Sequence, residues 1–253
     1  MTHSRFAFFA CALLLLGACS KEKDIEPPAK LVAIPATLRI DRVWGSSVAG
    51  GDPVLRLGLG ISVDGERAYA SGRQGDVAAF DLKSGKKVWD VRLKVKLSGG
   101  TGAGNGLVVV GSSKGEVIAL EAASGAVRWK AHVGGEVLSA PVVAAQTVIV
   151  RAVDGKLHGL ALQDGHEAWL QEQQVPRLSL RGTSSPVVAG EAVLCGFDNG
   201  KVISVNEADG TLAWEAIVAP PRGRTELERL VDVDSAVKVI GDDVYAVGFQ
   251  GRA

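Results

Sequence analysis

The sequence predicts an all-β protein, a β-propeller of four-stranded antiparallel blades, and three observations support this. The five tryptophans recur at spacings of 45, 40, 40 and 45 residues, and fixed periods of this size are typical of propellers, solenoids or arrays. Glycines recur at fixed distances before four of them. No helical periodicity accompanies the repeat, which argues against a helical solenoid. The tryptophans are Trp44, Trp89, Trp129, Trp169 and Trp214.

Each repeat contains its own turn signals. One glycine lies fourteen residues before the tryptophan and a second lies four residues before it, as in Gly75, Gly85 and Trp89. Asp-Gly and Asn-Gly pairs at these places supply the positive φ angles that tight hairpins need. Short β-rich runs such as Lys201–Val205 lie between the turns. Each repeat therefore holds about four short strands, which form one propeller blade.

The propeller is expected over residues 38–253, with repeats that end near residues 89, 129, 169 and 214 and then a partial one. Roughly four to five blades are thus present. Each tryptophan falls on the outermost strand, where its ring is expected to pack between neighbouring blades. A further repeat begins at Gly251–Ala253. Because an open ring leaves an unpaired strand edge, we expect the chain to be the N-terminal part of a longer protein or a truncated gene product.

Residues 1–18 are expected to be a lipoprotein signal peptide, since the uninterrupted apolar run 6–16 is too short to span a membrane. Leu16-Gly17-Ala18-Cys19 resembles a lipobox, in which the cysteine is acylated, so Cys19 is the predicted lipidation site. An ordinary secretory signal that happens to contain a cysteine is the alternative. Residues 19–37 would then be the lipidated cysteine and a polar tether. Ser20 follows this cysteine, whereas an aspartate there would resemble the inner-membrane retention signal of lipoproteins. The resemblance therefore points to the outer membrane.

Composition and motifs argue against several functions. The formal net charge is zero, which argues against nucleic-acid binding because that needs a basic surface. No Ser-His-Asp arrangement, phosphate-binding loop or dinucleotide fingerprint is found. We therefore expect no catalytic residues and no cofactor.

The sequence also offers no metal site. His132, His158 and His166 have no close-spaced ligand partners, and Asp232-Val233-Asp234 lacks the further oxygen ligands of a calcium loop. Cys195 is interpreted as a buried packing residue.

The repeats differ in one respect that indicates function. The spacing from a tryptophan to the next repeat's first glycine is 26 residues in two cases, 31 in two and 37 in the last. The extra residues fall in two connections, 171–182 and 219–234, which would lie on one face of the propeller. Arg181 and Asp232 occupy the same place, nineteen residues before Gly200 and Gly251. Adjacent blades are therefore expected to present them side by side.

These two connections have the composition of a protein-binding site. Leu178 and Leu180 beside Arg181, close to the acidic pair Asp232 and Asp234, combine apolar anchors with groups that make directional bonds. We therefore predict that these five residues bind a protein partner. The alternative is structural: Arg181 and Asp232 bridge each other and only tie two blades together.

The repeat also resembles that of a known family. The pattern Gly-x-Val-x-Ala-Leu followed by Ser/Asp-Gly and Trp is similar to the repeats of pyrroloquinoline-quinone-type propellers. A lipobox followed by such repeats resembles the BamB family of lipoproteins of the β-barrel assembly machinery. The stretches that carry the resemblance are Leu178–Gly182, Asp198–Val202, Glu207–Gly210 and Arg229–Asp234.

The resemblance implies an eight-bladed ring that is lipid-anchored at the periplasmic face of the outer membrane and has no catalysis of its own. Such a scaffold binds the periplasmic domains of the barrel-inserting subunit BamA and aids folding and insertion of outer membrane proteins. Unfolded chains of those client proteins are a further candidate partner. In this family the two motif loops contact the partner. The residues at those positions here are Leu178, Leu180, Arg181, Asp232 and Asp234.

Two other functions remain open from the sequence. The first is a quinoprotein dehydrogenase-like enzyme, because such enzymes share the repeat. They carry a vicinal disulfide and a calcium–cofactor site, whereas no two cysteines are adjacent here. The second is a propeller that binds a polysaccharide or another small ligand.

Overall fold

The computed structural model describes residues 30–35, 37–51 and 58–249. The chain divides into two units, Met1–Asp41 and Arg42–Ala253. The described residues of the first unit are exposed and contain no strand. The predicted signal peptide and the predicted lipidation site Cys19 lie outside the described residues. Within the described part, no helix is long and apolar enough to cross a membrane.

The second unit consists of antiparallel sheets whose strands follow the order of the chain. Four sheets have four strands each, β1–β4, β5–β8, β9–β12 and β13–β16, and a two-stranded hairpin β17–β18 follows. We name the four sheets blades 1 to 4. The strands are β1 Ser62–Asp64, β2 Arg67–Ser71, β3 Asp76–Asp81, β4 Lys87–Arg92, β5 Leu97–Gly104, β6 Leu107–Ser112, β7 Glu116–Glu121, β8 Val127–His132, β9 Val142–Val143, β10 Thr147–Arg151, β11 Lys156–Ala161, β12 Glu167–Glu172, β13 Val187–Ala189, β14 Ala192–Gly196, β15 Lys201–Asn206, β16 Leu212–Ile217, β17 Lys238–Ile240 and β18 Asp243–Tyr245.

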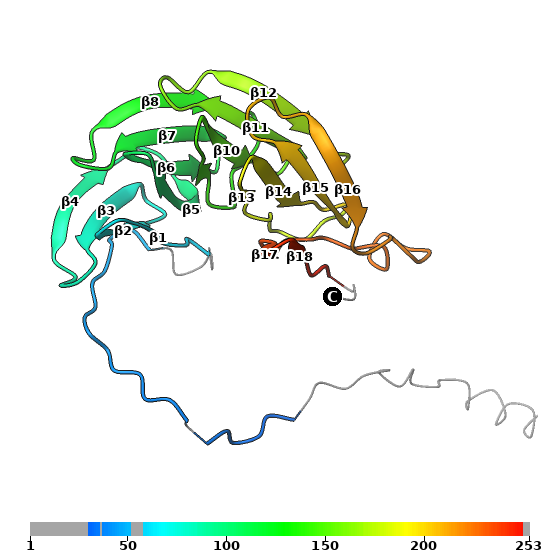
Figure 1. Cartoon of the computed structure of the whole chain (residues 1–253), viewed down its shortest axis with the longest axis horizontal. Coiled ribbons are helices and arrows are strands. Elements are labelled where there is room, and N and C mark those ends of the chain that lie inside the picture. Colours follow the sequence, from blue (N-terminus) through cyan, green and yellow to red (C-terminus); the bar gives the residue numbers. More distant parts are fainter. Residues whose placement is uncertain (1–29, 36, 52–57, 250–253) are drawn as a thin grey trace, which may run out of the picture. The chain divides into compact units, whose positions relative to one another are not determined.

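The blades succeed one another along an arc (Figure 1). The fourth strands β4, β8, β12 and β16 lie along its outer side, whereas β5 and β13 lie toward its inner side. Each tryptophan of a complete repeat therefore sits on an outermost strand. The predicted fold class, a β-propeller of four-stranded antiparallel blades, is confirmed.

The tryptophans join each blade to the next. The indole Nε1–H donates to a backbone carbonyl of the following blade at 2.8–2.9 Å in four cases. The same ring covers the glycine of that blade's outer turn: a Cβ on Gly125 would come within 2.7 Å of the Trp89 ring. Only glycine leaves room for the indole there, which explains the fixed spacing of the repeat. The donor–acceptor pairs are Trp44–Leu82, Trp89–Ala122, Trp129–Leu162 and Trp169–Glu207.

Trp214 differs from the other four tryptophans. It lies on β16, its side chain is 40 % exposed, and no following blade covers it among the described residues. The expectation that all five rings pack between blades is therefore confirmed for Trp89, Trp129 and Trp169. Trp44 packs on blade 1 from the segment that precedes it, and Trp214 is left uncovered among the described residues.

The hydrophobic core is divided among the interfaces between blades. On β6, Leu107 and Val109 face blade 3, whereas Val108 and Val110 face blade 1. Alternate residues of a strand point to opposite faces, so a strand buried on both faces is apolar throughout. This arrangement explains why the inner strands read as continuous apolar runs and not as alternating ones. The blades thus hold the loops between them in fixed positions.

Candidate functional site

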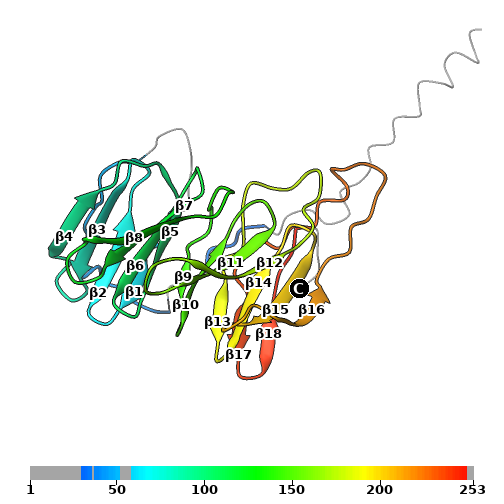
Figure 2. The same cartoon turned by 90° about the horizontal axis from the view of Figure 1, so that it is seen from above.

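The two long connections lie side by side. The first loop, residues 173–186, joins β12 to β13, and the second loop, residues 218–237, joins β16 to β17. The backbone N–H of Leu180 in the first loop donates to Asp232 Oδ1 in the second at 3.0 Å. The hydroxyl of Ser184 donates to the carbonyl of Ser235, also at 3.0 Å. The expectation that adjacent blades present these two segments together is confirmed, and both loops project at one end of the blades (Figure 2).

Three of the predicted residues lie at the surface of the first loop. Leu178 is 42 % exposed and Leu180 is 36 % exposed, although both are apolar. Arg181 Nη2 donates to Glu136 Oε1 at 2.9 Å, and half of the Arg181 side chain remains exposed. Apolar side chains on a loop next to an accessible guanidinium form a surface that can bind a protein.

The partner of Arg181 is a residue that the sequence analysis missed. Glu136 lies nineteen residues before Gly155, which is the repeat position of Arg181 in the preceding blade. The same counting that aligned Arg181 with Asp232 could therefore have found it. The structural alternative, in which Arg181 and Asp232 bridge each other, is wrong: Arg181 pairs with Glu136, and Asp232 accepts from the Leu180 backbone.

The two predicted carboxylates lie beneath the first loop. Asp232 is 2 % exposed, and its burial raises the pKa of the carboxyl, an effect that the hydrogen bond from Leu180 opposes. Asp234 is partly buried; burial first, and then the negative charges of Asp232 and Asp198, raise its pKa to about 6. Gly182 allows this approach, since a Cβ there would lie 2.6 Å from Asp234 Oδ2. Both carboxylates therefore contact the backbone of the first loop, Asp232 at Leu180 and Asp234 at Gly182.

A third buried carboxylate joins this pair. Asp198, in the turn between β14 and β15, is buried, and one carboxylate oxygen from each of Asp198, Asp232 and Asp234 lies within 4.8 Å of the others. Arg151 Nη2 lies 3.4 Å from Asp198 Oδ1, and its guanidinium covers the ring of Phe197 at 4.2 Å. Asp198 belongs to the stretch Asp198–Val202 that carries the family resemblance, but spacing alone does not place it near Asp232. Burial raises the pKa of Asp198, and the Arg151 charge opposes this.

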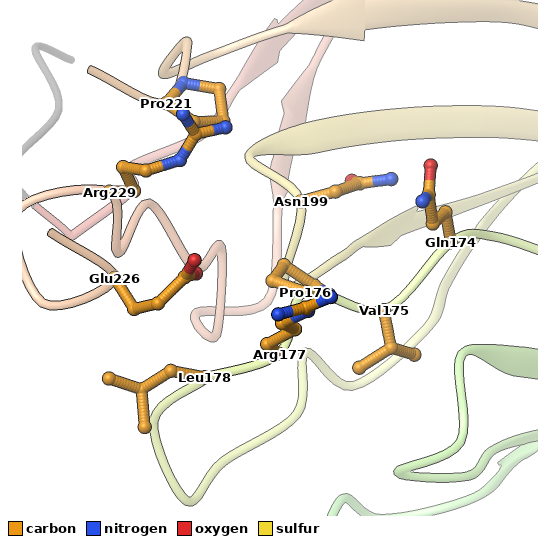
Figure 3. Close-up of a pocket in the computed structure, with 9 residues that line it drawn as sticks. All are labelled: Gln174, Val175, Pro176, Arg177, Leu178, Asn199, Pro221, Glu226 and Arg229. Atoms are coloured by element: carbon orange, nitrogen blue, oxygen red, sulfur yellow. The ribbon is translucent and has the colours of Figure 1, made fainter. Parts of the chain in front are cut away.

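A pocket of about 320 Å³ opens between the two loops (Figure 3). Its polar side chains include Arg177, Arg229 and Glu226, which have no ion pair or side-chain hydrogen bond with the described residues. Leu178 lines the same pocket, so one predicted anchor residue borders a cavity with unpaired charge. The full lining is Gln174, Val175, Pro176, Arg177, Leu178, Asn199, Pro221, Glu226 and Arg229.

Three other reactive side chains, those of Cys195, His158 and His166, are buried or paired within their own blades. Cys195 is fully buried, and burial raises the pKa of its thiol to about 12, so it remains protonated and packs as a small apolar residue. His158 Nδ1 lies 2.7 Å from Glu167 Oε2, and His166 Nδ1 lies 2.7 Å from Asp164 Oδ1. Each of these two histidines has a single carboxylate partner close by.

Comparison with known proteins identifies the family. A family model described as outer membrane protein assembly factor BamB matches residues 73–253. The outer membrane protein assembly factor BamB of Pseudomonas aeruginosa is 41 % identical over 247 residues, which cover 98 % of this chain and 65 % of the relative. The chain belongs to the BamB family. It spans just under two thirds of the length of the curated relatives that it matches.

Solved structures agree with the fold. The crystal structure of BamB from Moraxella catarrhalis superposes with a TM-score of 0.73 at 26 % identity, over 81 % of this chain and 62 % of that one. The quinohemoprotein alcohol dehydrogenase from Comamonas testosteroni gives a TM-score of 0.53 at 16 % identity, over 74 % of this chain and 38 % of that one. The second similarity concerns the propeller fold alone. The BamB-family chain thus shares its architecture, though not its sequence, with quinoprotein enzymes.

Proposed function

We propose that this chain is a non-catalytic scaffold of the outer-membrane β-barrel assembly machinery. It would be anchored through lipid on Cys19 at the periplasmic face of the outer membrane and would bind the periplasmic domains of a BamA-type partner. Its relatives are named as outer membrane protein assembly factors, which supports the setting. The observation that carries the proposal is the first loop, which holds Leu178, Leu180 and Arg181 together at the surface.

Exposed apolar side chains on a well-held loop are suited to binding. Burying Leu178 and Leu180 under a partner removes apolar surface from water, worth about 25 cal/mol per Å² before the costs of association. Arg181 adds directional bonds to a partner carbonyl or carboxylate. The hydrogen bond from Leu180 N–H to Asp232 reduces the freedom of this loop before binding, which lowers the entropic cost.

The five predicted residues thus take two roles in the proposed site. Leu178, Leu180 and Arg181 contact the partner directly. Asp232, buried and bonded to the Leu180 backbone, acts through the loop, and Asp234 supports it at Gly182. The pocket beside Leu178 extends the surface and offers unpaired charge of both signs to the partner or to a client chain.

The enzyme alternative has less support. The similarity to quinohemoprotein dehydrogenases is at the level of fold, and function does not follow from fold. The residues brought together on the loop face are apolar and guanidinium groups, which suit recognition better than the binding of a redox cofactor. No observation favours a polysaccharide ligand.

A pull-down of the periplasmic domains of the barrel-inserting partner tests the proposal. We expect Arg181→Glu to weaken binding by at least about 30-fold, which corresponds to a hot spot of about 2 kcal/mol. Leu180→Asp should have a similar effect, because it places a charge in the apolar contact. Asp232→Arg is a poor test, since it buries a second guanidinium near Arg151 and disturbs the loop itself.

Arg128→Glu is the matched control. Arg128 pairs with Glu121 at 3.1 Å and is 44 % exposed, much as Arg181 pairs with Glu136, but it lies on the outer strand β8. The control should bind as the unmodified chain does. If Arg181→Glu and Leu180→Asp both bind normally while remaining folded by circular dichroism, this loop face is not the binding site.

A further inference from the structure

The acidic cluster beneath the first loop has an unbalanced charge. Asp198, Asp232 and Asp234 contribute three carboxylates, and Arg151 contributes the guanidinium that lies 3.4 Å from Asp198. Within the part of the chain that the structure describes, one positive charge against three negative ones leaves two uncompensated. Burying uncompensated charge is costly, so a further cation would stabilise this arrangement.

Two oxygens in the cluster have no hydrogen-bond donor among the described residues. Asp232 is almost completely buried, and while its Oδ1 accepts from Leu180, its Oδ2 has no partner. Asp234 Oδ1 is likewise buried and without a partner. Nearly all buried polar atoms in proteins are bonded, and a carboxylate oxygen without a donor inside the protein is what a bound cation satisfies.

The three carboxylates lie close enough together to share one calcium ion. Ca²⁺ binds oxygen ligands at about 2.3–2.6 Å, so two ligands on opposite sides of it lie about 4.6–5.2 Å apart and neighbouring ligands lie closer. The cluster offers one oxygen from each aspartate within 4.8 Å of the others. The three side chains come from the β14–β15 turn and from the second loop. A single ion could therefore contact all three.

We propose that Asp198, Asp232 and Asp234 bind a divalent cation, with Ca²⁺ as the preferred ion. From the sequence no metal is expected here, because Asp232-Val233-Asp234 lacks further oxygen ligands; the fold supplies Asp198 as one. Backbone carbonyls or water would complete the coordination. The ion would tie the β14–β15 turn to the second loop, and through Asp232 and Gly182 to the first loop. The binding of the ion does not depend on any partner.

Isothermal titration calorimetry of the purified, metal-stripped chain with CaCl₂ tests the site. We expect one saturable site per chain with a Kd on the order of 10⁻⁴–10⁻³ M, as in extracellular calcium modules. Asp198→Asn and Asp234→Asn should each weaken binding by about 10-fold or more, as expected when a charged ligand is removed from such a site. Asp234 is only partly buried, so its amide variant remains informative if Asp198→Asn fails to fold.

Asp154→Asn is the matched control, because Asp154 lies in the corresponding turn of blade 3 and pairs with Lys156 at 3.3 Å. It should leave calcium binding unchanged. The proposal is overturned if the unmodified chain shows no saturable heat up to about 10 mM Ca²⁺, well above the Kd range of such modules. It is also overturned if Asp198→Asn and Asp234→Asn, both folded, bind as the control does. MgCl₂ in place of CaCl₂ should bind more weakly, since Mg²⁺ demands shorter, near-octahedral ligation.

Discussion

Aspartates in the outer turns of three blades stabilise those turns through their charge. Asp81 accepts from the N–H and hydroxyl of Ser84, and Asp209 accepts in the same way from Thr211. Asp164 accepts from the N–H of His166. Hydrogen bonds to the charged form lower the pKa of each carboxyl below its ordinary value of 3.8. Short acceptor side chains are common in turns because they bond to backbone a few residues ahead.

The pH dependence of these turns can be predicted. A lowered folded-state pKa contributes stability that is fully present above 3.8 and is lost as the pH falls through the lowered value. Asp209→Ala should therefore reduce the free energy of unfolding at pH 7 more than at a pH well below 3.8. Urea unfolding at both pH values measures this. Asp209→Asn keeps an acceptor oxygen without titrating, so its effect should vary less with pH; an equal loss for Asp209→Ala at both values would contradict the prediction.

At the scale of the element, the outer strands of blades 1, 2 and 3 are each joined to the next blade by a tryptophan. Trp129 on β8 is buried, donates to Leu162 of blade 3, and covers Gly165 of the same turn. One residue thus supplies apolar burial, a hydrogen bond and the steric fit that requires glycine opposite it. Trp214 occupies the equivalent place on β16 but is much more exposed.

This difference predicts unequal effects of the same substitution. Trp129→Ala should lower the free energy of unfolding by about 3–5 kcal/mol, as expected for removal of a buried large side chain. Trp214→Ala should cost less, because 40 % of Trp214 is already exposed and no following blade covers it among the described residues. Urea denaturation followed by circular dichroism compares the two. Similar losses of unfolding free energy for both variants would mean that contacts of the tryptophan with the next blade do not stabilise the fold.

At the scale of the whole molecule, stability comes from interfaces that two blades share. Ile118 on β7 belongs to the core between blades 1 and 2, together with Tyr69 and Val77 of blade 1. Ala119, the next residue, belongs to the core between blades 2 and 3. Blade 2 is therefore stabilised by both of its neighbours.

A cavity in one shared core should affect both blades that border it. Ile118→Ala should lower the free energy of unfolding by about 2–5 kcal/mol and should speed hydrogen exchange in β2 and β3 as well as in β7. Val127→Ala, at an exposed position on β8, should change neither. Hydrogen exchange read by mass spectrometry reports the effect by strand. Faster exchange confined to blade 2 would show that the blades are not coupled through this core.

The sequence alone determined the fold class and singled out the two long connections between blades. This was possible because each repeat needs particular residues at fixed positions. A glycine is needed where φ is positive or where an indole leaves no room for a side chain, and a tryptophan lies at a constant distance from that glycine. The unusual length of two connections likewise needed no structure to be seen. Trp214 and the pairing of Arg181 were not predicted correctly, since both depend on neighbours that counting did not consider.

Only the tertiary structure decided how the candidate site is organised. Repeat counting brought Arg181 and Asp232 into adjacent blades, yet their side chains point to different partners, Glu136 and the Leu180 backbone. Burial of Asp232 and its approach to Asp198 arise from the packing of loops over blade 4. Side-chain direction and solvent exclusion depend on contacts between residues far apart in the chain. The spacing of a repeat along the sequence carries no information about those contacts.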